Sequence, residues 1–217
     1  MPAVRLQVEQ LRRRLRGFAE WQATWLREGW ETVAVELETP KSGVPFPVDD
    51  QPMMLTGRID RIDYNARTGS WAVLDYKTSA RPRTPEQAHR RRGGAWRDLQ
   101  LPLYRHLLPG LSEAGALPEE AARPDAALRL GYVNVSRGET ADALARWTDD
   151  DLADADEAAR ACVRLLRSGR IEYRADEPVA PYSPFGGLLG RGRLVPGGDG
   201  EAGPEEGDTG GHDEGDA

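Results

Sequence analysis

The stretch GRIDRIDYNARTGSWAVLDYK at residues 57–77 decides how the chain folds. Polar and apolar side chains alternate along residues 53–64, as they do in half-buried β-strands, and residues 70–78, SWAVLDYKT, form the next predicted strand. The residues between them, 65–69, read NARTG, which is a short turn sequence with a glycine. We therefore predict a β-hairpin, which makes part of the sheet antiparallel.

Periodicity on either side of the hairpin predicts the remaining elements. The predicted order is helix 4–30, strand 32–38, loop 39–52, strand 53–64, strand 70–78, loop 79–94, helix 96–108, strand 128–135 and helix 149–168. Tryptophans on the first helix and the strands (Trp21, Trp25, Trp30 and Trp71) are predicted to lie in the core. This order is typical of an α/β fold, in which a single domain has a central mixed β-sheet flanked by helices.

The C-terminal residues differ in composition from the rest of the chain. Residues 197–217 hold eight acidic residues, eight glycines and no Lys or Arg, and periodicity is lost after Tyr173. The net charge of −7 comes from this tail, because the rest of the chain carries +1. We predict one folded domain over 1–175, an irregular segment over 176–196 and a disordered Gly/acidic tail over 197–217.

The single cysteine, Cys162, limits the classes of site that the chain can form. One cysteine excludes an internal disulfide, a multi-cysteine zinc site and a four-cysteine iron–sulfur cluster within this chain. Cys162 is predicted to lie on the buried face of its helix. No apolar run approaches the roughly 18–20 residues of a membrane helix, so we predict no membrane segment and a cytoplasmic protein.

Residues with chemical potential gather on the hairpin. Asp75 and Lys77 are two residues apart on one strand, so their side chains share one face of the sheet. Asp60 lies across the hairpin and can reach the same point, whereas Asp63 is expected to face away. Two carboxylates and a backbone carbonyl make a site that suits Mg²⁺ or Mn²⁺, and a nearby lysine can stabilise charge on a phosphate. Alone, however, an Asp-x-Lys pair is usually a solvated ion pair.

The helix that follows carries Gln100 and Tyr104, which are four residues apart and share one helix face. The combination resembles the PD-(D/E)xK nuclease superfamily, in particular the RecB-like nuclease domain that ends RecB- and AddB-type helicase–nuclease subunits. GRIDRID, VLDYKTS and DLQLPLY are similar to its three strongest blocks. The resemblance is firm over residues 54–108, weaker to about residue 170, and implies a restriction-endonuclease-like fold.

The resemblance also implies roles for single residues. The implied roles are metal binding by Asp60, Asp75 and the Tyr76 carbonyl, catalysis by Lys77, and positioning of the DNA strand or of the lysine by Gln100 and Tyr104. The implied activity is a Mg²⁺- or Mn²⁺-dependent deoxyribonuclease, expected to be an exonuclease, in recombination or double-strand-break repair with a helicase partner. No iron–sulfur cluster is expected, although AddB-type domains often carry one.

One departure concerns the upstream metal contact that many members take from a helix histidine or glutamate. The first predicted helix has no histidine, so the substitutes are Glu20, Glu28, Glu31 and Glu36. A cluster of arginines follows the lysine strand and is predicted to bind DNA phosphates, or else to be a solvated surface. Its members are Arg81, Arg83, Arg90, Arg91, Arg92 and Arg97. His89, in the same segment, is interpreted as a bystander.

Two other functions stay open at this point. The chain could be a catalytically incomplete DNA-binding or scaffold fragment of a helicase–nuclease complex. It could also be an unrelated α/β domain in which the motifs arise by chance. Metal-dependent cleavage would distinguish the nuclease from both alternatives. Affinity for DNA in EDTA would distinguish the DNA-binding or scaffold fragment from the unrelated α/β domain.

Overall fold

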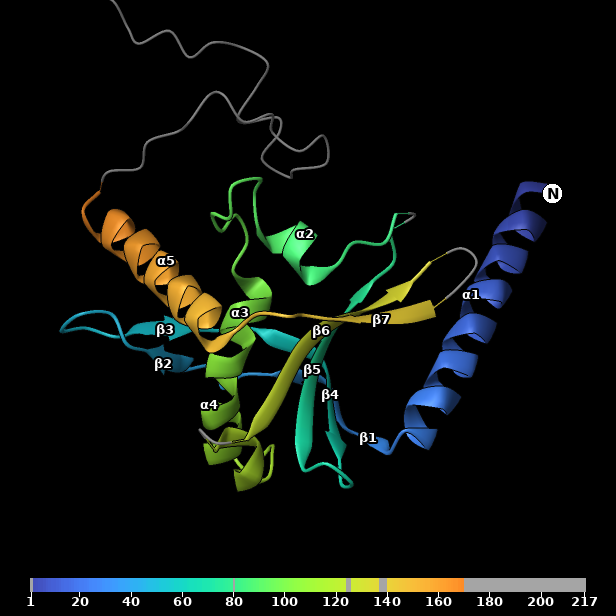
Figure 1. Ribbon diagram of the computed structural model, residues 1–217, viewed down its shortest axis with the longest axis horizontal. Coiled ribbons are helices and arrows are strands. Elements are labelled where there is room, and N and C mark those ends of the chain that lie inside the picture. The colour runs from blue at the N-terminus through green and yellow to red at the C-terminus, as the bar shows by residue number, and fades with distance from the viewer. Residues whose placement is uncertain (1, 80, 124–125, 137–139, 170–217) are drawn as a thin grey trace, which may run out of the picture. The chain divides into compact units, whose positions relative to one another are not determined.

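The computed structural model describes residues 2–79, 81–123, 126–136 and 140–169 (Figure 1). Its elements are α1 (Pro2–Arg27), β1 (Trp30–Glu38), β2 (Val44–Phe46), β3 (Met53–Leu55), β4 (Arg58–Asn65), β5 (Ser70–Lys77), α2 (Pro85–His89), α3 (Gln100–Tyr104), η1 (Arg105–Leu107), α4 (Leu108–Glu113), η2 (Glu119–Ala122), β6 (Ala127–Val135), β7 (Thr140–Leu144) and α5 (Asp149–Arg167). The predicted irregular segment and acidic tail lie outside the described residues.

The centre of the fold is a five-stranded mixed sheet in the order β1-β4-β5-β6-β7. β5 and β6 are parallel, and the other neighbours in the sheet are antiparallel. The predicted hairpin is confirmed, because β4 and β5 pair from Asn65–Ser70 to Arg61–Leu74 and Gly69 closes the turn with a φ of 67°. The predicted α/β domain is likewise confirmed, and it is consistent with a restriction-endonuclease-like fold.

Successive side chains of β5 enter two different cores, because a strand presents alternate residues to opposite faces of a sheet. Ala72 and Leu74 pack with the tryptophans of α1 and β1. Trp71 and Val73 pack with apolar side chains of α3, η1 and α4. Figure 1 shows α1 on one side of the sheet and α3 and α4 on the other. The four tryptophans predicted for the core are all buried.

A buried ion pair holds α1 against the sheet. The Trp25 indole donates to Asp63 Oδ2 at 2.7 Å, and Arg61 Nε donates to both Asp63 oxygens at 2.8 Å. Arg61 also donates to Gln22 Oε1 of α1 at 2.5 Å. These bonds confirm that Asp63 faces away from Asp75, because they lie on the opposite face of the sheet. The two charges compensate each other, which their burial requires.

Several predicted elements are corrected by the structure. The first helix ends at Arg27 rather than residue 30, because Gly29 turns the chain with a φ of 98° into β1. The predicted loop 39–52 contains β2, and the predicted strand 53–64 is two strands, β3 and β4, which belong to different sheets. In place of the predicted helix 96–108, three short pieces, α3, η1 and α4, run from Gln100 to Glu113, and the predicted loop 79–94 contains α2. The edge strand β7 is absent from the prediction.

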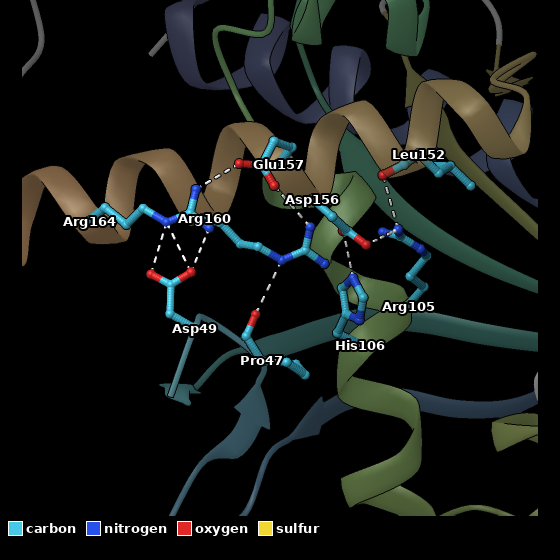
Figure 2. Close-up of polar contacts among 9 residues, drawn as sticks. All are labelled: Pro47, Asp49, Arg105, His106, Leu152, Asp156, Glu157, Arg160 and Arg164. Carbon is cyan, nitrogen blue, oxygen red and sulfur yellow. Dashed lines mark hydrogen bonds and ion pairs between the residues drawn. The ribbon is translucent and has the colours of Figure 1, made fainter. Parts of the chain in front are cut away.

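Polar contacts fix α5 on the β2–β3 hairpin and on η1, as Figure 2 shows. Asp156 accepts hydrogen bonds from Arg105 and from the His106 ring, each at 2.7 Å. Further along the helix, Arg164 pairs with Asp49 at 2.6 Å. The prediction for Cys162 is wrong, since its side chain is exposed. The buried face of α5 follows Ala155, Ala159 and Val163, and Cys162 lies one residue off that line.

Candidate active site

The candidate site lies where β4 and β5 part. Their pairing stops at Arg61 and Leu74, whereas β5 continues beside β6 as far as Lys77 and Asn134. In the gap, the Asp60 carboxylate accepts a hydrogen bond from the Tyr76 N–H at 3.0 Å. The N–H and C=O of one strand residue point to the same side, so the Tyr76 carbonyl also points toward Asp60. The predicted oxygen ligands therefore lie together at this end of β5.

Asp75 and Lys77 share one face of the sheet and contact each other. The Lys77 ammonium lies 2.6 Å from Asp75 Oδ2, and Asp75 is only 5% exposed. Burial raises the pKa of Asp75, and the Asp60 charge raises it further, whereas the contact with Lys77 opposes the shift. The Asp60 carboxylate accepts from the N–H of the residue after Asp75, which places the two negative charges near enough to repel each other. A cation placed between them would relieve that repulsion.

Tyr132 of β6 forms one wall of the site. It is directly opposite Asp75 in the parallel pair, and the Lys77 ammonium lies 4.8 Å from the centre of its ring. The Tyr132 hydroxyl contacts His89 Nε2 in a short hydrogen bond, and His89 Nδ1 lies 2.8 Å from the Asp98 carbonyl oxygen. Because a carbonyl only accepts, Nδ1 carries the proton, and in the neutral ring Nε2 accepts from Tyr132.

His89 and Tyr132 were missed as members of the site by sequence reasoning. His89, interpreted as a bystander in a loop, is 1% exposed at the end of α2. His89 Nδ1 also lies 3.4 Å from Asp98 Oδ1, and this contact lowers the pKa of the Asp98 carboxyl, which burial alone would raise. The available signal for Tyr132 was its position on a predicted strand of the same sheet as Asp75. The register that places Tyr132 opposite Asp75 cannot be deduced from the sequence of either strand.

Gln100 and Tyr104 lie on α3, which packs over the same face of the sheet. Gln100 Nε2 donates to the Tyr104 hydroxyl at 2.8 Å, which confirms their shared helix face. Tyr104 is buried, and burial together with the charges of Asp75 and Asp60 raises its pKa to about 12. The hydroxyl therefore stays protonated at any physiological pH. Tyr104 packs in one buried cluster with Val73 of β5 and Tyr132 of β6, so the Gln/Tyr pair lies over the face of the sheet that carries Asp75.

The donor set fits a hard divalent cation. Carboxylate and carbonyl oxygens are what Mg²⁺ and Mn²⁺ take, and Mg²⁺ needs only one or two carboxylates from a protein. Asp60, Asp75 and the Tyr76 carbonyl meet this description. Within residues 2–79, 81–123, 126–136 and 140–169, no group of three or more His, Cys, Asp or Glu side chains gathers around one point.

The glutamates predicted as substitutes for an upstream ligand lie in different places. Glu20 is on α1, which covers the face of the sheet opposite Asp75. Glu31 pairs with Tyr64, at the other end of β4 from Asp60. Glu36 is on β1 beside the Asp60 end of β4, but it has a φ of 50° and pairs with Arg58 at 3.0 Å. Glu28 follows the end of α1 and is exposed.

The predicted DNA-binding arginines divide into three groups. Arg81 and Arg83 are exposed and line a pocket of about 480 Å³ together with Lys77, Ser79 and Tyr132. Arg90 instead pairs with Asp151 at 2.7 Å and stacks 4.2 Å above the Trp96 ring. Arg91, Arg92 and Arg97 are exposed in the segment after α2. The pocket places two cations beside the candidate lysine.

The family model of the PD-(D/E)XK nuclease superfamily matches residues 2–181. The chain belongs to this superfamily. The match spans every element that builds the site, and the superfamily's members are generally nucleases. It excludes the interpretation of an unrelated α/β domain with chance motifs. No curated protein matches the chain.

Residues 75–77 at the end of β5 carry the pattern after which the superfamily is named. The pattern in the superfamily's name ends in an acid, any residue and a lysine, which Asp75, Tyr76 and Lys77 supply here. Among the helices that the structure describes, none is long and apolar enough to cross a membrane.

Proposed function

We propose that this domain is a RecB-like deoxyribonuclease that depends on Mg²⁺ or Mn²⁺. The observation that carries the proposal is the meeting of Asp60, Asp75 and Lys77 at the open end of β5. The basic pocket beside Lys77 supports a polyanionic substrate, because arginines on a nucleic-acid surface bind the phosphate backbone. The choice of DNA is supported by the similarity of GRIDRID, VLDYKTS and DLQLPLY to RecB-like blocks.

Each residue of the site has a proposed task. Asp60, Asp75 and the Tyr76 carbonyl would hold the cation, which when bound supplies Lewis-acid activation of a water and neutralises phosphate charge. Lys77 stabilises charge that develops on the phosphate. The protonated Tyr104 hydroxyl can donate to a phosphate oxygen, and Gln100 orients that hydroxyl through their hydrogen bond. Arg81 and Arg83 hold the DNA strand beyond the reacting phosphate.

The wider setting of the proposal rests on the RecB-like resemblance. We infer an exonuclease that acts in recombination or double-strand-break repair, in the cytoplasm, with a helicase as partner. Linear and covalently closed circular DNA separate the two modes of cleavage, because an exonuclease needs an end. Degradation of linear DNA alone supports the exonuclease, whereas linearisation of the circle contradicts it.

A second candidate is a catalytically incomplete DNA-binding or scaffold module of a helicase–nuclease complex. Two observations favour it. Within the part of the chain that the structure describes, no third acidic or histidine side chain joins Asp60 and Asp75. Lys77 also forms an ion pair with Asp75, and this contact occupies its ammonium group.

The experiment that tests the proposal compares two lysine variants in DNA degradation with Mg²⁺, with Mn²⁺ and with EDTA. Lys77→Ala should abolish cleavage and leave DNA affinity in EDTA nearly unchanged. Lys41→Ala, which removes the chain's other lysine at an exposed position, should cleave like the wild type. DNA binding by the wild type without metal-dependent cleavage would favour the scaffold. Neither binding nor cleavage would overturn both candidates.

A further inference from the structure

The N-terminal half of α1 carries an apolar stripe that is exposed among the described residues. Val4, Val8, Leu11 and Leu15 follow one another at steps of four, three and four residues and are 54%, 43%, 56% and 57% exposed. Residues at these steps lie on one helix face, in the narrow pattern of a coiled-coil seam. Contiguous exposed apolar side chains of this kind mark interaction sites on proteins.

The stripe continues the face by which α1 packs on the sheet. The next residue in the series, Phe18, contacts the Trp21 and Tyr76 rings, with centroids 5.7 and 5.9 Å away. Trp25 further along is buried. Figure 1 shows the N-terminal half of α1 running out past the edge of the sheet at β7. The sheet therefore covers the apolar face of the second half of the helix and leaves that of the first half uncovered.

Basic residues border the stripe. Arg5, Arg12 and Arg14 occupy the heptad positions next to the apolar ones, where charged side chains set the choice of partner helix. Glu9 is the only acidic residue between positions 2 and 16, and it lies within 4.0 Å of Arg12 and 3.6 Å of Arg13. A second copy of α1 would bring arginine against arginine along these borders, which disfavours self-association.

We propose that the Val4–Leu15 stripe docks an acidic amphipathic helix of a partner protein. The partner helix would present Leu, Ile or Val to the stripe and Glu or Asp to its arginine borders. The chain's own residues 197–217 are acidic but hold no Val, Leu, Ile or aromatic residue, so they cannot fill an apolar seam. The stripe is also narrow and free of aromatic side chains, unlike the broad Trp- and Phe-bearing faces of membrane-surface helices.

The stripe runs out past the edge of the sheet, and the packed half of α1 covers the face opposite Asp75, so occupation of the stripe can be tested apart from nuclease chemistry. The probe is a fluorescent synthetic peptide of about 21 residues, or three heptads, with Leu at the seam and Glu at the bordering positions. Its binding to the full chain is followed by anisotropy. A second peptide carries Lys in place of every Glu. We expect the Glu peptide to bind and the Lys peptide not to bind.

The matched variants change leucines of similar exposure on two helices. Leu11→Gln with Leu15→Gln should weaken binding of the Glu peptide by roughly tenfold or more, about 1.4 kcal/mol. Leu165→Gln with Leu166→Gln, which alters leucines of α5 that are 49% and 57% exposed, should leave it unchanged. Equal binding of both peptides, or an equal loss in both variants, overturns the proposal. A dimer or binding to phosphatidylserine vesicles that depends on Leu11 and Leu15 overturns it as well.

Discussion

The position of the Lys77 ammonium is set by groups on two sides of it. The Asp75 carboxylate lies 2.6 Å away, and the face of the Tyr132 ring lies 4.8 Å away. Tyr132 is itself held by its hydroxyl bond to His89, whose other nitrogen is bound to the Asp98 carbonyl. The orientation of the lysine therefore depends on residues that it does not touch, from the segment between β5 and α3.

Removal of the Tyr132 hydroxyl tests this support. In Tyr132→Phe, the buried His89 Nε2 loses its donor, which should lower the free energy of unfolding by about 1–3 kcal/mol in urea denaturation. Tyr64→Phe is the matched control, because the half-buried Tyr64 ring contacts Trp71 on the same sheet. Equal losses of stability in the two variants would contradict a special role for the Tyr132–His89 bond.

At the scale of elements, the buried Asp156 carboxylate is one of the groups that hold α5 on η1. Burial alone would raise the pKa of Asp156, but the hydrogen bond from His106 and the charge of Arg105 outweigh it and lower that pKa. A carboxyl whose pKa is lowered by folding stabilises the folded state fully above its unfolded pKa of 3.8. That stabilisation is lost as the pH falls through the lowered pKa.

Asp156→Asn should therefore have a pH-dependent effect. At pH 7 we expect a loss of about 1.5–3 kcal/mol in the free energy of unfolding, because the variant no longer accepts hydrogen bonds as a charged group. The difference from the wild type should shrink as the pH falls below 3.8. Urea denaturation between pH 7 and pH 3 measures it, with Asp150→Asn on the exposed side of the same helix as control. A difference that is constant with pH would contradict the role of the Asp156 charge.

The sequence predicts the long periodic elements and misses the short ones. The elements β5, α1, β6 and α5 are predicted close to their observed bounds, because each extends its apolar pattern over eight or more residues, whereas the predicted strand 53–64 merges β3 with β4. β2 and β3 have three residues each, and β2 contains Pro45 and lies in a proline-rich segment. Strands of that length carry no measurable period, so only tertiary pairing defines them.

The candidate site shows the same limit. The spacing of Asp75 and Lys77, and the step from Gln100 to Tyr104, are local and follow from the sequence. The approach of His89 to Tyr132 spans 43 residues and depends on how the segment after β5 folds back. The sequence also does not distinguish the exposed leucines of α1 from core leucines. Periodicity shows which side chains share one helix face, but it does not show whether another element covers that face.

At the scale of the whole molecule, basic residues lie on both sides of the sheet, but those beside Lys77 are proposed to bind DNA. Replacing Arg81 and Arg83 together by Ala should weaken DNA binding and reduce the slope of log affinity against log salt by about 0.9 for each phosphate that is no longer neutralised. Arg12→Ala with Arg13→Ala removes the same charge from α1 and should leave the slope unchanged. Equal changes in both double variants would indicate a general charge effect.

The measurement that tests the central claim most directly is the rate of DNA cleavage by Asp75→Asn in saturating Mg²⁺ or Mn²⁺. The substitution keeps the size of the buried side chain and removes the charge that would hold the cation. We predict that cleavage falls by about 10³-fold or more, roughly 4 kcal/mol in activation free energy, while Asp150→Asn retains the wild-type rate. Metal-dependent cleavage by Asp75→Asn at the wild-type rate would contradict the assignment of the site.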